Sequence, residues 1–347
     1  MPYAIDNAEL AEFQKHLVGT WSNKGVPTWP GGKPLSYNIM PLPQVEPQRG
    51  YPCCLGYVLK NFAYTEEIRF NSSKDPNAIA VPATAPNRGG RYTQRSRALF
   101  YDQRVRFAEG PQGPTGAKTD PDNRAKGLGD TVHVENGSWL YLDSVEQKLG
   151  PYGDDPAKPG PIVPQPREIG IAKQIAVPHG NSVLALGIVH DMQKGAPTIP
   201  NADIPYPSPL KDYDFPSWDI SAFPYYTKLN NDNDYENPNP DLSINPNLVL
   251  REAVDKIKPN AFIYWRVDTD PVIKDGKQLG KGVVTNIPFE ERRANVTCHS
   301  TECWLLSTNG GKSYDYLSYI QIIIMQIPLI GQPYNFPHVT ANTVKCI

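Results

Sequence analysis

Alternation of apolar and polar residues is clearest at residues 131–142, Thr-Val-His-Val-Glu-Asn-Gly-Ser-Trp-Leu-Tyr-Leu. Two alternating runs flank an Asn-Gly pair, which is the commonest sequence of a two-residue type I′ hairpin turn. We therefore expect a β-hairpin that turns at this pair. On that register His133 and Glu135 share one face of the hairpin, and Trp139 lies on the other.

The same two-residue period recurs along the chain and is typical of half-buried strands. It predicts further strands at residues 97–107, 169–177, 182–190, 262–267, 282–287, 303–307, 314–327 and 338–345. Helical periodicity is confined to residues 8–17, with Asp6 and Glu9 as a capping pair, and to residues 248–257. Many strands and two short helices indicate an all-β, antiparallel sandwich or barrel, because parallel neighbours need a crossover helix.

Composition refines this architecture without changing it. The chain has 347 residues, of which 39% are hydrophobic, so it is long enough to bury a sizeable core, and we expect one domain over residues 1–347. Its 37 prolines gather in long loops. Residues 196–246 mix Pro, Asn and Asp with Tyr, Phe and Trp, whereas disordered linkers are poor in aromatic residues. We interpret them as an ordered strap or lid over the body of the protein.

Charge disfavours two classes of partner. The 34 basic and 36 acidic residues are spread evenly, for a net charge of −2, so neither nucleic acid nor an anionic membrane is an expected partner. The longest apolar stretch, 319–330, contains Gln and Pro and is shorter than the ~20 residues of a membrane span. We expect a soluble protein without a signal peptide at its written start. Sequons at Asn71, Asn136 and Asn295 leave the secretory pathway open.

Five cysteines do not define a disulfide framework, although Cys298 and Cys303 flank a predicted turn and form a candidate bridge. Most catalytic motifs are missing from the sequence: it has no Gly-x-Ser-x-Gly, no His-Glu-x-x-His, no dinucleotide fingerprint and no Cys-x-x-Cys. Residues 310–313, Gly-Gly-Lys-Ser, mimic the end of a phosphate loop. Because Leu306 replaces the required first glycine and strands flank the segment, a hairpin turn is the better interpretation.

A short predicted helix leads into Gly19-Thr20-Trp21, as at the entry of lipocalin-type and fatty-acid-binding-type barrels. Six further segments follow in order: Asn38-Ile39-Met40, Pro86-Asn87-Arg88-Gly89, His133-x-Glu135-x-Gly137-x-Trp139-Leu140, Ile175-Ala176-Val177-Pro178-His179-Gly180, Thr285-Asn286-Ile287-Pro288-Phe289 and Pro337-His338-Val339. Together they resemble a lipocalin-like family of bacterial and fungal proteins often labelled haem-binding. The resemblance spans residues 13–345.

The fungal members that this chain resembles include hetero-Diels-Alderases of tropolone sesquiterpenoid biosynthesis. The resemblance implies an enlarged antiparallel lipocalin-like β-barrel with long Pro-rich loops. It also implies a cofactor-independent [4+2] cyclase that joins a tropolone-derived quinone methide to a humulene-type alkene. The segment 196–246 and the cysteines depart from the shorter bacterial pattern, so bacterial ligand preferences are not carried over.

Such a cycloaddition needs no nucleophile, which agrees with the missing triads. Catalysis then rests on holding two apolar reactants in a reactive pose, donating a hydrogen bond to the heterodiene oxygen and excluding water. An acid would also help to expel hydroxide from a hydroxymethyl precursor. The candidate donors are Arg88, His133, Tyr64 and Tyr319, and the candidate pocket walls are Trp21, Trp139, Trp265 and Trp304. No metal or cofactor is required, and the expected partners are hydrophobic small molecules.

Two alternatives remain open. A protein that carries haem or another hydrophobic ligand without turnover would use His133, His179 or His338 as an axial ligand. His133 and Glu135 could form a proton-relay pair or a metal pair, although a satisfied polar pair on the wall of a sheet is commoner. The third class is a structural β-protein whose interior is filled by its own side chains.

Overall fold

The structure is a computed structural model of the full chain. It describes residues 10–29, 32, 34–43, 57–62, 64–70, 83–86, 92–107, 131–146, 163–164, 170–177, 180–202, 208–209, 242, 245–274, 277–292, 294–329 and 332–347. Of the expected strap, only 196–202, 208–209, 242 and 245–246 belong to this set, so its role as a cover lies outside the described residues.

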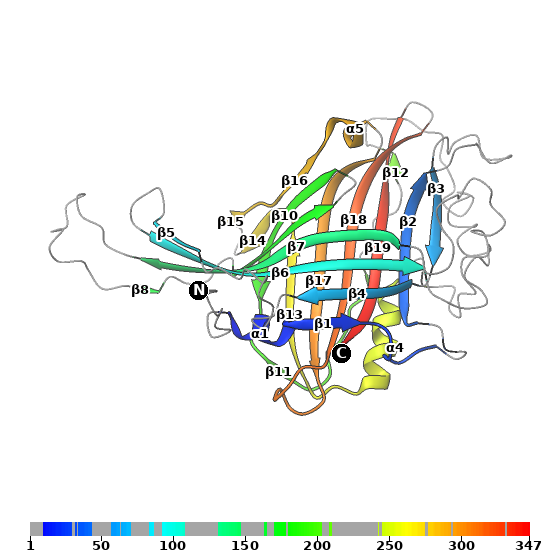
Figure 1. The fold of residues 1–347 in the computed structure, drawn as a ribbon. Helices are drawn as coiled ribbons and strands as arrows, with labels where there is room; N and C mark the ends of the chain where they lie inside the picture. The colour runs from blue at the N-terminus through cyan, green and yellow to red at the C-terminus, as the bar shows by residue number, and fades with distance from the viewer. Residues whose placement is uncertain are drawn as a thin grey trace, which may run out of the picture.

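Ten strands form a closed antiparallel β-barrel (Figure 1), so the expected all-β, lipocalin-like architecture is confirmed. The ring closes where the last strand pairs with the first, with Trp21 opposite Cys346. Because side chains alternate along each strand, every second residue points into the barrel. In order around the ring the strands are β1 (Gly19–Ser22), β4 (Tyr64–Phe70), β6 (Tyr92–Phe107), β7 (Thr131–Glu146), β9 (Ile171–Val177), β10 (Asn181–Val189), β13 (Ala261–Asp268), β17 (Asn295–Ser307), β18 (Tyr316–Leu329) and β19 (Gln332–Cys346).

Shorter strands extend the sheet away from this ring. β2 (Ser36–Pro43) pairs with β19 and carries β3 (Tyr57–Phe62), while β16 (Val283–Asn286) pairs with β10. β6 and β7 run past the barrel at the left of Figure 1, where they meet β5 (Ala83–Pro86) and β8 (Val163–Pro164). The remaining strands are β11 (Gln193–Lys194), β12 (Ser208–Pro209) and the separate pair β14 (Val272–Lys274) and β15 (Lys277–Gly280).

The described residues contain three short helices, of which the sequence predicted two. α1 (Glu12–Leu17) starts later than expected, and the proposed cap of Asp6 and Glu9 lies outside the described residues. α4 (Asn247–Ile257) is as predicted, and its buried face packs against β18 and β19 on the outside of the barrel. α5 (Pro288–Glu291) is a single turn that begins at a proline, a residue favoured at the first helical position.

The prediction of a hairpin at residues 131–142 was wrong. This segment is one continuous strand, β7, in which Gly137 pairs with Tyr101 of β6 on one side and with Ile175 of β9 on the other. The glycine serves close packing instead of a turn, because an added Cβ would lie 2.2 Å from the backbone oxygen of Gln174. Glu135 and Trp139, assigned to opposite faces by the hairpin register, are therefore on the same inward face.

The other predicted strands are confirmed, although β6, β17 and β19 begin well before the predicted residues 97, 303 and 338. The strands β2, β3, β4 and β5 were not predicted. Cys298 and Cys303 both lie on this one strand and are free thiols, so the candidate bridge between them was wrong. The glycines at 310 and 311 take positive φ angles of 74° and 85° in the turn between β17 and β18, as expected of a hairpin.

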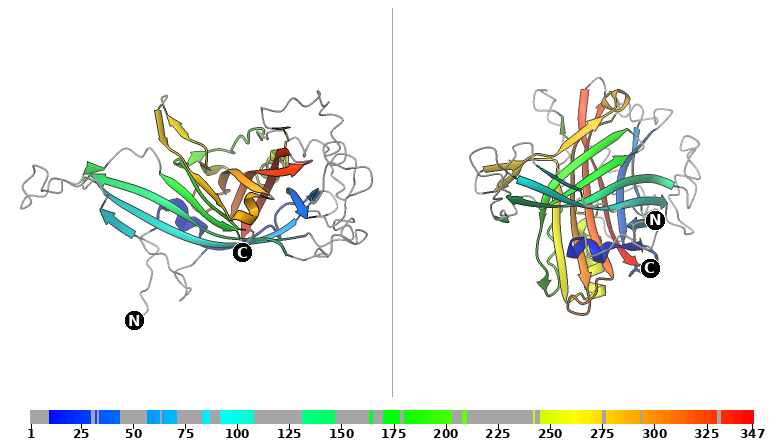
Figure 2. Two further views of the ribbon diagram at one scale, coloured as in Figure 1. Left: turned by 90° about the horizontal axis from the view of Figure 1, so that it is seen from above. Right: turned by 60° about the vertical axis from the view of Figure 1, so that its left-hand side comes forward.

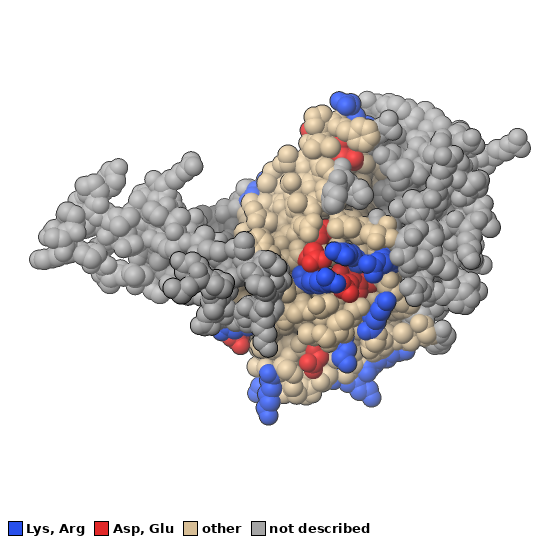
Figure 3. Space-filling view, in the orientation of Figure 1, with Lys and Arg blue, Asp and Glu red and all other residues tan. Residues whose placement is uncertain are grey.

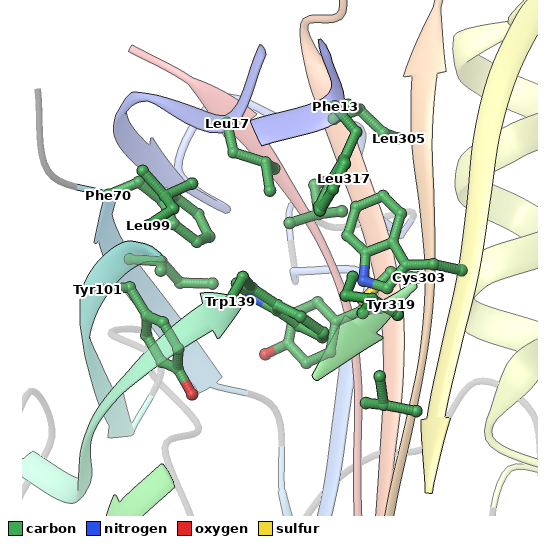
Figure 4. Close-up of a cluster of buried hydrophobic side chains, with 14 of the residues drawn as sticks. Phe13, Leu17, Phe70, Leu99, Tyr101, Trp139, Cys303, Leu305, Leu317 and Tyr319 are labelled. Carbon is green, nitrogen blue, oxygen red and sulfur yellow. The ribbon is translucent and has the colours of Figure 1, made fainter. Parts of the chain in front are cut away.

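Two hydrophobic clusters stabilise this arrangement. The first fills the barrel interior, and α1 contributes Phe13 and Leu17 to it (Figure 4). Figure 2 shows the ribbon of α1, in dark blue, beside the strands of the barrel. Gln14 fixes that helix to the sheet, since its side-chain amide donates to the backbone oxygen of Trp139 at 2.9 Å. The second cluster lies outside the ring between α4 and the barrel wall and includes Trp304.

None of the helices in the described residues has the length and hydrophobicity needed to span a bilayer. On the outside of β4 and β6, acidic and basic side chains are mixed in one patch (Figure 3). Arg69 and Glu67 form an ion pair there at 2.7 Å, and Arg104 lies 3.8 Å from Asp102. The described part of this face therefore carries no single sign of charge.

Candidate functional site

Polar side chains form three rows across the inner face of β17, β18 and β19. The register places the residues of each row directly opposite one another, and the rows are two residues apart on every strand. All of these positions alternate with outward ones, so they face the barrel interior. The rows are Cys303–Tyr319–Asn342, Thr301–Gln321–Thr340 and His299–Ile323–His338.

The first row surrounds the carboxyl group of Glu66, which is 2% exposed on β4. The Tyr319 hydroxyl donates to both of its oxygens, at 2.6 and 2.7 Å. Asn342 donates its amide at 2.5 Å, and the Gln103 amide donates as well. Burial raises the pKa of Glu66, an effect that these three donors oppose and the charge of Glu135 reinforces.

Two of the predicted donors, Tyr64 and Tyr319, meet in this cluster. The Tyr64 hydroxyl is hydrogen-bonded to Tyr319 and also lies 3.5 Å from the backbone oxygen of Ala341. Burial raises the pKa of both phenols well above their usual value, and the neighbouring Glu66 raises it further. Both phenols therefore stay protonated and can donate hydrogen bonds at neutral pH.

A second buried carboxyl group, Glu135 of β7, has a different environment. Its oxygens lie 3.3 Å from the Lys173 ammonium and 3.7 Å from His133 Nε2. The Tyr101 hydroxyl donates to it at 2.5 Å. Burial acts to raise the pKa of Glu135, but Lys173 and His133 outweigh it, so the pKa is lowered well below the usual range.

Lys173 lies at the centre of the polar group around Glu135, which we call the Glu135 cluster. Its ammonium donates to Gln321 Oε1 at 2.7 Å and lies 5.5 Å from the centre of the Trp139 ring. A buried ammonium placed over aromatic faces gains cation–π attraction as well as its ion pair. The pKa values of the two glutamates are thus shifted in opposite directions: Glu66 holds its proton more tightly, and Glu135 is ionised. Such a pair suits acid–base chemistry.

Three of the four predicted wall tryptophans lie in the interior. Trp139 and Trp265 pack edge to face with ring centroids 5.8 Å apart, and Trp21 is fully buried with its indole N–H donating to Leu17 O at 2.7 Å. Trp304 points outward, because its neighbours Cys303 and Leu305 on β17 point inward. Its ring packs outside the barrel against Tyr264, with the centroids 5.4 Å apart. The structure therefore does not bring Trp304 to the same chamber.

The other predicted residues are placed as follows. His133 joins the cluster through Glu135, and its side chain is 12% exposed. His338 points inward on β19 and is 9% exposed. Arg88 and His179 lie outside the described residues.

Sequence reasoning missed Glu66, Lys173 and His299, all buried in the interior. A signal for the first two was present: each is a charged residue at an apolar position of an alternating run, Glu66 between Tyr64 and Ile68 and Lys173 between two isoleucines. A charge at the inward position of a strand must be paired or functional.

The room between these groups is small. A cavity of about 30 Å³ lies between the Glu66 and Glu135 clusters. Its lining includes Tyr101, Lys173, Tyr319 and Gln321. That is space for a water molecule. In Figure 4 the hydroxyls of Tyr101 and Tyr319 point to the side of the apolar cluster opposite Phe13 and Leu17. The polar groups therefore lie on one side of this apolar cluster, which we call the apolar floor of the interior.

A larger hollow of about 880 Å³ lies on the outside of β6, β7, β9 and β10, with Phe100 and Val283 among its apolar lining. Both side chains are exposed, at 38% and 52%. Among the described residues its lining includes the buried Tyr101 but no buried carboxyl, amine or imidazole group. The interior is therefore the better candidate for chemistry.

The molecule is thus a lipocalin-like antiparallel β-barrel whose largely apolar interior contains buried carboxyl, phenol and amine groups. No protein-family model matches the chain, and no curated protein matches it. Among solved structures, the crystal structure of Rv2717c from M. tuberculosis aligns over 97% of this chain and 99% of that one, with 12% sequence identity and a TM-score of 0.35. A likeness this remote bears on neither activity nor ligand.

Proposed function

We propose that the protein is a cofactor-independent hetero-Diels-Alderase that joins a tropolone-derived quinone methide to a humulene-type alkene inside the barrel. The observation that supports it best is the Glu66 cluster, in which a carboxyl group of raised pKa is linked to two phenol donors in an apolar chamber. Nucleophilic mechanisms would make no use of this arrangement. A reaction that needs proton transfer and hydrogen-bond donation uses all of it.

Glu66 would act first as an acid. In the structure the Tyr319 hydroxyl donates to Glu66, so the relay requires this hydrogen bond to reverse: the carboxyl hydrogen passes to the Tyr319 oxygen and the phenol hydrogen passes to the hydroxymethyl oxygen of the precursor. The carbon–oxygen bond then breaks, and water leaves. The resulting carboxylate then recovers a proton from the ring hydroxyl of the same molecule. The net change is loss of one water, and the product is the neutral quinone methide.

Tyr64 and Tyr319 would then act as donors. A hydrogen bond to the heterodiene oxygen draws electron density from the diene and lowers the barrier to addition across the alkene. The apolar floor and the tryptophans hold the alkene close to the diene and exclude water, which would otherwise quench the quinone methide.

Size imposes a condition on this proposal. Ligand pockets usually enclose 300–1,000 Å³, so a sesquiterpene does not enter the cavity of about 30 Å³ without displacement of side chains. Trp139 and Tyr101 line that cavity and are the groups that would have to move. Binding should accordingly change the fluorescence of the interior tryptophans.

The test compares products formed with and without protein. The quinone-methide precursor and humulene are incubated with wild type, with Tyr319→Phe and with Tyr316→Phe, whose ring lies on the same strand but contacts Lys345 at 5.6 Å outside the Glu66 cluster. Wild type and Tyr316→Phe should give a changed product ratio and a faster reaction, and Tyr319→Phe should not. A product distribution identical to that of the protein-free reaction would refute the proposal.

Haem binding without turnover is the second candidate, supported by the inward placement of His338 and His299 in one row. Imidazole nitrogens suit haem iron, but haem needs several hundred Å³, whereas the interior cavity encloses about 30 Å³ and neither histidine lines it. The residues around that cavity therefore do not fit the group as they stand. A Soret band on haem titration that is lost in His338→Ala would favour this candidate over the enzyme.

A further inference from the structure

His299 differs from the other polar side chains of the three rows on β17, β18 and β19 that the hydrogen bonds below satisfy. It lies on the inward face of β17, is 1% exposed, and neither ring nitrogen has a hydrogen-bond partner among the described residues. Only its backbone is satisfied, by Thr269, whose hydroxyl accepts from His299 N at 2.9 Å. The neighbouring rows differ, since Thr301 donates to Gln321 and Asn342 donates to Glu66.

An unpaired polar group in a protein interior is costly, so its presence calls for a partner. Burial, reinforced by the positive charge of Lys173, lowers the pKa of His299 to about 3. Glu135 opposes that change, and His338 adds to it. The ring is therefore neutral at physiological pH and offers one N–H donor and one nitrogen acceptor. A hydroxyl group, which both donates and accepts, complements this pair.

Position sets His299 apart from the Glu66 cluster. Tyr319 of β18 pairs with Cys303 of β17, and His299 lies on β17 four residues from Cys303. Four residues of antiparallel strand span about 13 Å. A ligand that reaches both points must be extended, with a polar group at each end and an apolar middle.

We propose that His299 is a specificity-determining residue that binds a hydroxyl group at the far end of the interior ligand. This inference rests on the proposed function, because it assumes that an apolar guest occupies the barrel. The ligand class it names is an apolar terpenoid-sized molecule carrying an alcohol. His299 selects it over the matching hydrocarbon.

Binding of a matched pair of probes tests the proposal. Farnesol and farnesene share a sesquiterpene chain and differ in the alcohol, and their binding is followed by quenching of tryptophan fluorescence. Wild type should prefer farnesol by about tenfold, the difference that one well-placed hydrogen bond supplies. The preference should vanish in His299→Leu and return in part in His299→Gln, whose amide also donates and accepts.

Thr301→Val provides the matched control. Thr301 lies two residues away on the same face of β17, but its hydroxyl already donates to Gln321 at 3.5 Å. This variant should keep the preference for farnesol. If it loses the preference as fully as His299→Leu does, the effect belongs to the packing of the strand, and the proposal is wrong.

A second measurement does not depend on how the variants fold. The ring ¹⁵N resonances of His299 in the wild-type protein should move on addition of farnesol and stay in place with farnesene. Unmoved resonances in the presence of bound farnesol would overturn the proposal and would indicate an interior water as the partner. If neither probe binds, the proposed function fails too. If both bind equally while cyclisation proceeds, only the role of His299 fails.

Discussion

Tyr319 on β18 donates its hydroxyl hydrogen to the carboxyl group of Glu66 on β4, with oxygen–oxygen distances of 2.6 and 2.7 Å. The two residues are 253 positions apart in sequence and meet only because the barrel closes. Their contact converts an isolated buried acid into one that can pass a proton through a phenol to the interior. It is the link on which the proposed chemistry depends.

Tyr319→Phe removes this link. We expect the rate of product formation to fall by about 10²-fold, the lower end of what general acid catalysis contributes. Stability should also fall, by about 1–3 kcal/mol, since Glu66 loses one of its donors. Stopped-flow measurement of precursor loss and urea unfolding separate the two effects, with Tyr316→Phe as the control. An unchanged rate would remove Tyr319 from the mechanism.

Glu66 gives the unfolding free energy a characteristic pH dependence. Burial raises its folded pKa above 4.5, so the folded state holds this proton more tightly than the unfolded chain does. Its contribution to stability is fully present below pH about 4.5 and is lost as the pH rises through the folded pKa. Urea unfolding from pH 4 to pH 8 should show this loss in wild type relative to Glu66→Gln. A difference that stays constant with pH would contradict the assignment.

Lys173 compensates the buried charge of Glu135. Lys173→Met should therefore destabilise the protein by about 3–5 kcal/mol, because it leaves an ionised carboxylate without its partner in the interior. Adding Glu135→Gln should restore much of that loss, since the double variant buries no charge at this point. The free energies of unfolding of wild type, both single variants and the double variant, measured by chemical denaturation, form a double-mutant cycle that gives the interaction energy of the two groups. Additive effects would show that the two groups do not interact.

Gly137 tests the corrected strand. Gly137→Ala places a methyl group 2.2 Å from the Gln174 backbone oxygen and 2.6 Å from the Tyr101 hydroxyl, so β7 and β9 must separate. We expect a loss of about 3 kcal/mol. Gly170→Ala, at a glycine with nothing within 4 Å of its added Cβ, should stay within about 0.5 kcal/mol of wild type. Equal effects of the two substitutions would favour the hairpin turn that the sequence suggested.

Local sequence patterns predicted seven of the ten strands of the ring and α4, because alternation and helical periodicity report which face of an element is buried. The same rules failed at residues 131–142, where an Asn-Gly pair imitates a turn. The turn signal is local, whereas the need for a glycine arises from Tyr101 and Gln174, which come from other strands. Nothing in a single sequence shows that approach.

The candidate site was predictable only in part. Tyr64 and Tyr319 were both named as candidate donors, although only Tyr319 lay on a predicted strand, and they do meet. Their shared acid was missed, since a glutamate at an alternating position is more often solvated than buried. Trp304 was grouped with the interior tryptophans because the sequence does not show which residue of β17 lies opposite Trp265. In the structure that residue is Cys303, so Trp304 next to it points outward. Side-chain direction depends on the closed ring, which the sequence does not encode locally.

The pairing of β19 with β1 has a consequence for how the chain is made. Trp21 can find its partner Cys346 only after nearly the whole described chain has left the ribosome, so the ring cannot close before β19 has been made. Until then both terminal strands present unpaired backbone groups that can recruit neighbouring nascent chains. Expression in a host with slow elongation or scarce chaperones should therefore yield aggregates of an otherwise sound sequence.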